Sequence, residues 1–124
     1  VYSQGLHTLS SRPGVLRAGI LVSSSGYAGN GAGLNNPELQ ELHNIGPLPR
    51  GRYRLGEWIT HEHLGPLSCA LTPCVDITGS YAWLLGRGGF YFHGPVLSEG
   101  CIVQLHEVRL GLSTAGYRFV DVVR

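Results

Sequence analysis

Glycine and proline occur so often in this chain that its regular elements must be short and its turns numerous. Of the 124 residues, 19 are glycine and seven are proline. Both residue types favour turns and tight connections between strands. The hydrophobic share of 43% and the charged share of 14% argue against disorder. We therefore expect a single domain over residues 1–124, large enough to bury a core without a disulfide or a metal.

The spacing of apolar residues predicts mostly strands, at 2–9, 15–24, 52–59, 67–72, 90–92 and 117–123. The glycine- and asparagine-rich segment 27–36 predicts a loop. Asn36 is expected to cap a short helix that runs to about Leu42, with Pro37 at its first position. Helical spacing also occurs over 104–112. These elements predict a β-rich α+β fold, a sandwich or mixed sheet with one or two short helices.

The charged residues restrict the partners that this chain can have. A formal net charge of +1 gives no footprint for a polyanion, so we expect no nucleic acid partner. All nine basic residues are arginine, so a cationic anchor for a substrate carboxylate would have to be arginine. No apolar run approaches the roughly 18 residues of a membrane span, and no signal-peptide pattern occurs. We therefore expect no membrane insertion.

The segment between His93 and Cys101 contains the residue types of a nucleophilic site. His93 follows a predicted strand, and Cys101 leads into the segment with helical spacing. A nearby imidazole or a helix N-terminus lowers the pKa of a thiol from about 8.5 and makes it a nucleophile. Main-chain N–H groups at a helix start also suit an oxyanion. The alternative is that Cys101 is a small buried residue and His93 a structural one.

This segment resembles the active-site signature of L,D-transpeptidases, the YkuD-type catalytic domains. The matching residues are His93-Gly94 and Ser98-Glu99-Gly100-Cys101-Ile102. The rest of the chain is similar to a narrower group, the L,D-transpeptidase-like effectors of type VI secretion systems. The similar segments follow one another along nearly the whole chain: 27–31 (YAGNG), 35–37 (NNP), 45–53 (IGPLPRGRY), 64–66 (LGP) and 86–87 (GR).

The resemblance implies a cysteine enzyme that acts on the tetrapeptide stems of bacterial peptidoglycan and needs no cofactor. Cys101 would attack the carbonyl of the diamino acid at position three of the stem. His93, oriented by the carbonyl of Gly94, would take the thiol proton and later protonate the leaving D-alanine. The N–H groups of Cys101 and Gly100 would bind the oxyanion, and Ser98 would support the site.

Two departures from the cross-linking enzymes bear on the reaction. The loop between His93 and Cys101 is shorter, and Gln104 stands where the cross-linkers carry Arg or Asn. A compact mouth favours L,D-carboxypeptidase activity or exchange of the terminal D-alanine over the joining of two stems. A catalytically dead module of the same fold that binds peptidoglycan or a protein is the alternative of another class.

The effector resemblance also implies where the domain acts. The producer cell would secrete it, and it would be toxic in the periplasm of the target bacterium, where peptidoglycan lies. The producer would then need a cognate immunity protein, which we expect to cover the cleft near Cys101.

Three further residues are candidates for substrate binding. Arg87 lies just before the strand that ends at His93 and would hold a substrate carboxylate, unless it is a surface arginine in a turn. Tyr27 and Asn30 would line the cleft, although residues of such a loop commonly serve its turns.

His61, His63, Cys69 and Cys74 include ligand types for zinc, but their pattern is not that of a typical zinc site. An HxH pair on a strand places both rings on one face without a metal. The CxxxxC spacing differs from the common zinc knuckle, so we expect no metal site. A disulfide between Cys69 and Cys74, across a turn at Thr72-Pro73, is preferred to zinc. Three reduced thiols remain the open alternative.

Overall fold

The computed structural model describes residues 2–4, 8–10, 21–23, 26–74, 87–94 and 100–123. These ranges contain a helix, α2 (His106–Ala115), and two 3-10 turns, η1 (Gly31–Gly33) and η2 (Pro37–Leu39). They also contain nine strands: β1 (Tyr2–Ser3), β2 (Thr8–Ser10), β3 (Leu21–Ser23), β4 (Tyr27–Ala28), β5 (Gly51–His61), β6 (Gly65–Pro73), β7 (Phe90–His93), β8 (Ile102–Val103) and β9 (Phe119–Val123). The predicted β-rich α+β class is confirmed.

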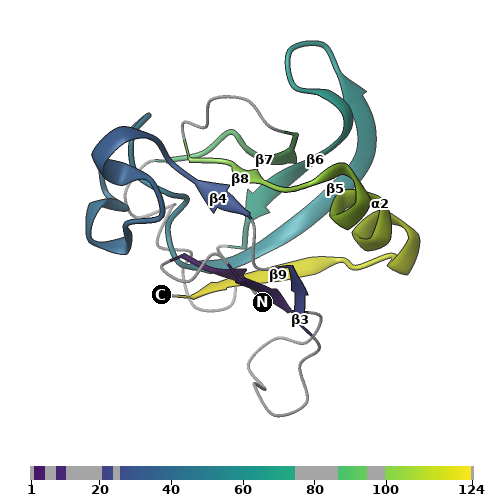
Figure 1. The fold of residues 1–124 in the computed structure, drawn as a ribbon, viewed down its shortest axis with the longest axis horizontal. Coiled ribbons are helices and arrows are strands. Elements are labelled where there is room, and N and C mark those ends of the chain that lie inside the picture. Colours follow the sequence, from purple (N-terminus) through teal and green to yellow (C-terminus); the bar gives the residue numbers. More distant parts are fainter. Residues whose placement is uncertain are drawn as a thin grey trace.

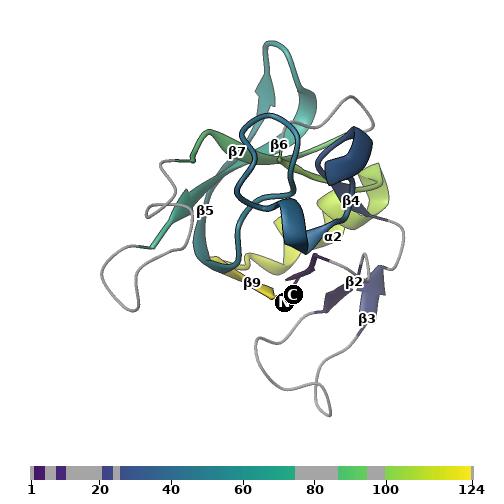
Figure 2. The ribbon, with the colours of Figure 1, turned by 90° about the vertical axis from the view of Figure 1, so that its left-hand side faces the viewer.

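The nine strands form one mixed sheet, in the order β3-β2-β1-β9-β5-β6-β7-β8-β4. Figure 1 shows β9 below and β7, β8 and β4 above, with β5 and β6 passing between them, so that the sheet curls around a core. The two ends of the described chain lie together, because β1 pairs in parallel with β9 (Figure 2). None of the described helices is long and apolar enough to cross a membrane.

The long hairpin of β5 and β6 connects the two halves of this sheet. Its register runs from Tyr53↔Pro73 to His61↔Gly65, with a turn over residues 62–64. The base of the hairpin pairs with β9 on one side and with β7 on the other. Among the described strands, none but its own partner pairs with the tip, which projects beyond the sheet at the top of Figure 1. The tip is therefore placed to border a site rather than to fill the core.

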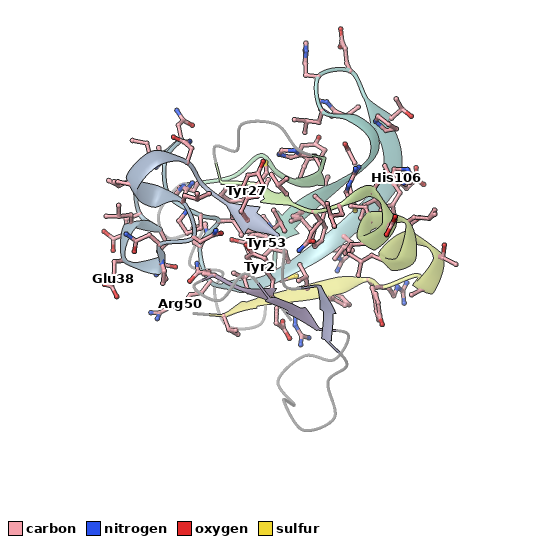
Figure 3. All side chains as sticks on the ribbon, viewed as in Figure 1. Tyr2, Tyr27, Glu38, Arg50, Tyr53 and His106 are labelled. Atoms are coloured by element: carbon pink, nitrogen blue, oxygen red, sulfur yellow. The ribbon has the colours of Figure 1, made fainter. Side chains whose placement is uncertain are left out.

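Aromatic side chains from both halves of the sheet build the core. Tyr53 meets Phe90 edge to face with ring centroids 6.0 Å apart, and Trp58 stacks on Phe92 at 5.9 Å. Full burial of such an aromatic side chain stabilises the fold by about 1.5–3 kcal/mol. Figure 3 shows Tyr53 and Tyr2 in the interior, whereas Glu38 and Arg50 project outward from the loops.

The predictions for the first 36 residues require two corrections. The strand predicted over 2–9 is wrong, because β1 and β2 pair antiparallel with Tyr2 opposite Leu9. Of the strand predicted over 15–24, only 21–23 lies within the described residues, and it is β3. Segment 27–36 is not all loop, since it contains β4 and η1. Tyr27 forms β4 by pairing with Val103, and no local sequence pattern predicts that contact.

The helix start at Asn36 is confirmed, but the helix is shorter than predicted. The side chain of Asn36 accepts a hydrogen bond from the N–H of Glu38 at 3.1 Å. Pro37 occupies the first position, and η2 ends at Leu39 as a single 3-10 turn. So short a segment gains too few hydrogen bonds to repay nucleation of an α-helix, and turns follow to residue 45.

Candidate active site

His93 ends β7, and Cys101 directly precedes β8, the parallel strand beside it. The register of β7 and β8 pairs Phe92 with Ile102 and His93 with Val103. Continued by one residue, this register places Cys101 beside Tyr91. Phe92 and Ile102 belong to the core, so alternation puts the side chains of His93 and Cys101 on the opposite face. Strand spacing sets their Cα atoms roughly 8 Å apart on that face, within reach of an imidazole and a thiol.

The thiol of Cys101 is partly exposed and lies against the backbone of β7. The main-chain N–H of Tyr91 donates to its Sγ at 3.3 Å. A donor in this position stabilises negative charge on the sulfur. The helix predicted from the spacing over 104–112 is confirmed as α2, but it begins at His106, so Cys101 does not lie at a helix start. Buried, β-branched Ile102 and Val103 instead pair with the neighbouring strands as β8.

His93 has one ring nitrogen engaged and is almost fully buried. Its Nδ1 lies 2.8 Å from the carbonyl oxygen of Gly94. A carbonyl only accepts, so the proton of the neutral ring is on Nδ1, and Nε2 carries the free lone pair. Burial lowers the pKa of His93, the Gly94 carbonyl raises it in part, and the charges of Arg109 and His61 lower it further. The ring is therefore held neutral, as a proton acceptor requires.

Arg109 on α2 supports the segment around Gly94. Its guanidinium donates to the carbonyls of Gln104 at 3.0 Å, Pro66 at 2.7 Å and Leu67 at 2.9 Å. A Cβ added at Gly94 would lie 3.0 Å from Arg109 Nη2. Arg109 was not among the site residues predicted from the sequence. One signal for it exists, because Arg109 stands three positions before the buried Leu112, on the apolar face of the helix.

Arg87 is buried, so the alternative of a surface arginine is wrong. Nη1 donates to the carbonyls of Gln40 at 2.5 Å and Pro47 at 2.7 Å, and Nη2 donates to that of Gly46 at 3.1 Å. The guanidinium also lies 5.2 Å from the ring centroid of Phe90. These contacts tie the 40–47 loop to the base of β7. They favour a structural role for Arg87 over the predicted role as a carboxylate anchor.

Gly100 occupies a position that has no room for a side chain. Its φ is +134°, and a Cβ there would lie 2.7 Å from both Arg87 Nη2 and Phe90 Cε1. The residue before Cys101 must therefore be glycine for the backbone to approach Arg87 this closely.

Burial lowers the pKa of Arg87, and attraction to Tyr53 and Cys101 raises it in part.

The remaining predicted site residues are Tyr27, Asn30 and Ser98. Tyr27, labelled in Figure 3, is on β4 opposite Val103, which in turn pairs with His93, so the register puts Tyr27 on the sheet face of His93. Asn30 donates from Nδ2 to the carbonyl of Asn44 at 2.6 Å and so holds a neighbouring loop. Ser98 lies outside the described residues.

An open pocket of about 320 Å³ lies beside Cys101. It is bordered by the hairpin tip, by β7 and by the loop that contains Asn44. The residues that line it include Asn44, His61, His63, Leu64, Tyr91 and Cys101. A larger groove of about 480 Å³ runs between β5, the end of α2 and β9, and neither Cys nor His is among the described residues that line it. The smaller pocket, which Cys101 lines, is therefore the candidate site for nucleophilic chemistry.

The structure rejects the disulfide between Cys69 and Cys74. All three cysteines are free. Cys69 lies within β6 and Cys74 directly after it, so five positions of extended chain separate them by roughly 16 Å, too far for an S–S bond. The turn expected at Thr72-Pro73 is wrong, because both residues belong to β6. Burial raises the pKa of the Cys69 thiol to about 11.

The histidines near the hairpin tip are not the strand pair that the HxH pattern indicated. His61 ends β5, whereas His63 lies in the turn. Within the described ranges, no three His, Cys, Asp or Glu side chains gather to hold a metal ion.

Comparison with known proteins yields one match. A family model described as the Tlde1 domain matches residues 23–115, more than half of the chain. No curated protein and no solved structure matches significantly. The matched segment contains His93, Cys101 and all the residues that line the pocket beside Cys101. The chain thus belongs to the Tlde1 domain family, the L,D-transpeptidase-like effectors of type VI secretion systems.

Proposed function

We propose that this domain is a cysteine acyl-transfer enzyme that removes or exchanges the terminal D-alanine of peptidoglycan tetrapeptide stems. One observation carries the proposal. Cys101 and His93 share one face of adjacent parallel strands, and His93 Nδ1 is bound to the Gly94 carbonyl, which leaves Nε2 as a base. A thiol and an oriented, neutral imidazole are the components of a nucleophilic pair.

In the first half of the reaction, Cys101 Sγ attacks the carbonyl carbon of the diamino acid at position three and forms a C–S bond. Nε2 of His93 takes the thiol proton. The oxyanion of the tetrahedral intermediate binds to the N–H groups of Gly100 and Cys101. The C–N bond to D-alanine then breaks, and Nε2 returns its proton to the leaving amine, which leaves a thioester on Cys101.

In the second half, a small acceptor resolves the thioester. Water gives a tripeptide stem, and the amine of a free D-amino acid gives an exchanged tetrapeptide. In each case His93 Nε2 takes a proton from the acceptor and returns it to the Cys101 sulfur. The pocket of about 320 Å³, bordered by the hairpin tip, favours such acceptors over a second stem attached to a glycan strand.

Family membership supports the setting of this reaction. Effectors of this family are secreted and act in target cells, and they usually have a cognate immunity protein. We infer that the domain acts in the periplasm of the target bacterium, because its substrate lies there. An immunity protein that covers the pocket beside Cys101 would prevent self-damage.

The test uses purified disaccharide-tetrapeptide, with and without a free D-amino acid, and mass spectrometry as the readout. We expect the intact domain to release D-alanine or to exchange it, and Cys101→Ala to do neither. Cross-linked dimers as the main product would contradict the trimming reaction. No conversion by either protein, with binding of peptidoglycan by both, would favour the binding module instead.

A further inference from the structure

The ring of His61 is held in a single orientation by the turn that follows it. Its Nδ1 accepts hydrogen bonds from the main-chain N–H groups of His63 at 3.0 Å and Leu64 at 3.2 Å. Because Nδ1 is an acceptor, the proton of the neutral ring is on Nε2. His61 is thus a fixed N–H donor at the tip of the hairpin, with the tautomer opposite to that of His93.

This donor lies at the pocket of the nucleophile. His61 and Cys101 both line the open pocket of about 320 Å³. The His61 ring meets the ring of Tyr91 edge to face at 4.9 Å, and the N–H of Tyr91 is the one that reaches Cys101 Sγ. The shared pocket and the ring contact with Tyr91 therefore place His61 near Cys101.

The proposed substrate requires a partner for its terminal carboxylate, and the structure leaves few candidates. The chain has no lysine. Arg87 and Arg109 direct their guanidinium groups onto main-chain carbonyls. None of the described residues that line the pocket is an arginine. The polar side chains at the pocket with N–H donors are those of Asn44, His61 and His63, and of these only the His61 ring is oriented by two hydrogen bonds.

We propose that His61 is a positioning residue of this site, whose Nε2–H donates a hydrogen bond to the terminal carboxylate of the stem peptide. This inference rests on the proposed function and deepens it. A hydrogen bond to that carboxylate selects stems that end in a free acid and places the bond to D-alanine at Cys101. It also explains why the arginine anchor expected from the sequence is not needed.

Two variants separate the donor from the structure of the turn. In His61→Asn the side-chain oxygen takes the place of Nδ1 and still accepts from the turn N–H groups, but the distal donor is lost. In His61→Gln the amide nitrogen takes the place of Nε2, so the distal donor remains. His106→Ala, at the exposed beginning of α2, is the matched surface control (Figure 3).

Steady-state kinetics would be measured on tetrapeptide stems that end in a free carboxylate or in a carboxamide. Wild type is expected to prefer the acid by about 10- to 100-fold in kcat/KM, the range of a hydrogen bond to a charged group. His61→Asn should lose most of that preference through a higher KM for the acid, with a smaller rise in KM for the carboxamide, whose oxygen accepts a weaker hydrogen bond. His61→Gln should retain much of the preference, and His106→Ala all of it.

The outcomes distinguish this inference from the function on which it rests. If wild type converts neither stem, the proposed function fails. If wild type converts the acid, but His61→Asn keeps the preference for it, the carboxylate contact is wrong and the function stands. An equal loss of kcat on both stems would place His61 at the oxyanion and would also overturn the proposal.

Discussion

The Nδ1 atom of His93 lies 2.8 Å from the carbonyl oxygen of the next residue, Gly94. The backbone thus supplies the orienting group that other nucleophilic sites take from a carboxylate. On the far side of Gly94 lies Arg109, whose Nη2 would be 3.0 Å from a Cβ at that position. The carbonyl of Gly94 therefore orients the ring of His93, and the positive charge of Arg109 acts on it.

The charge of Arg109 should contribute to the acid limit of activity, after the larger effect of burial. His93 accepts a proton only when it is neutral, so activity falls as pH drops through its pKa. Burial, Arg109 and His61 lower that pKa below the ordinary 6.5. Arg109→Gln removes one positive charge and should raise the pKa, which moves the acid limb of kcat/KM to higher pH.

The measurement is a pH profile of kcat/KM on the tetrapeptide, at a temperature where each variant is folded. Arg109→Lys keeps the charge and is the control, so its acid limb should stay nearer that of wild type. An acid limb unchanged in Arg109→Gln would show that the charge has no effect on the base.

Gly100→Ala should destabilise the domain and reduce activity. A methyl group there meets Arg87 Nη2 and Phe90 Cε1 at 2.7 Å, at a φ of +134° that other residues avoid. We expect a loss of about 2–4 kcal/mol in the free energy of unfolding, from overpacking and backbone strain.

Gly111→Ala is the matched control for urea unfolding. Gly111 lies exposed on α2, and nothing lies within 4 Å of the added Cβ. The substitution should stabilise the domain by about 0.5–1 kcal/mol through helix propensity. Equal effects of the two substitutions would contradict the close approach at Gly100.

Arg87→Gln should lower stability without changing substrate affinity. The substitution removes the fork that satisfies the carbonyls of Gln40, Gly46 and Pro47. Leaving buried carbonyls without donors costs about 2–4 kcal/mol in the free energy of unfolding. Arg118→Gln, at an exposed position, should change it by less than about 0.5 kcal/mol.

KM for the folded variant decides between the two roles of Arg87. If Arg87 holds only the loop, the folded fraction of Arg87→Gln keeps the KM of wild type. A KM raised at least tenfold at unchanged stability would restore the carboxylate anchor that the sequence suggested.

Features with local causes could be predicted from the sequence. The strand that ends at His93 follows from three adjacent aromatic residues, and the cap at Asn36 follows from its side chain and the proline after it. The long strands β5 and β6 carry enough apolar and β-branched residues to be recognised. Each of these signals lies within a few residues of the element that it specifies.

Features that depend on distant pairing could not be predicted. Ile102 and Val103 form a strand only because β7 and β4 lie on either side of them. Arg87 looks like a turn residue until the 40–47 loop folds over it. His61 becomes a pocket residue because a turn of the hairpin fixes its ring and the sheet brings Tyr91 beneath it. Apart from the hairpin turn itself, these contacts join residues ten or more positions apart, which spacing along the chain does not reveal.

The three thiols should differ in reactivity, which tests both the pocket and the absence of a disulfide. Cys69 is fully buried, and its pKa of about 11 leaves roughly one molecule in a thousand as thiolate at pH 8. Cys101 lines an open pocket, and Cys74 is partly exposed after β6. Iodoacetamide at pH 8 should therefore modify Cys101 and Cys74 in the native domain and modify Cys69 only after unfolding in denaturant. Peptide mapping by mass spectrometry identifies each site, and Cys101→Ala removes one label as the control. Native labelling of Cys69, or a cross-linked peptide that contains Cys69 and Cys74, would contradict the position of these residues on β6.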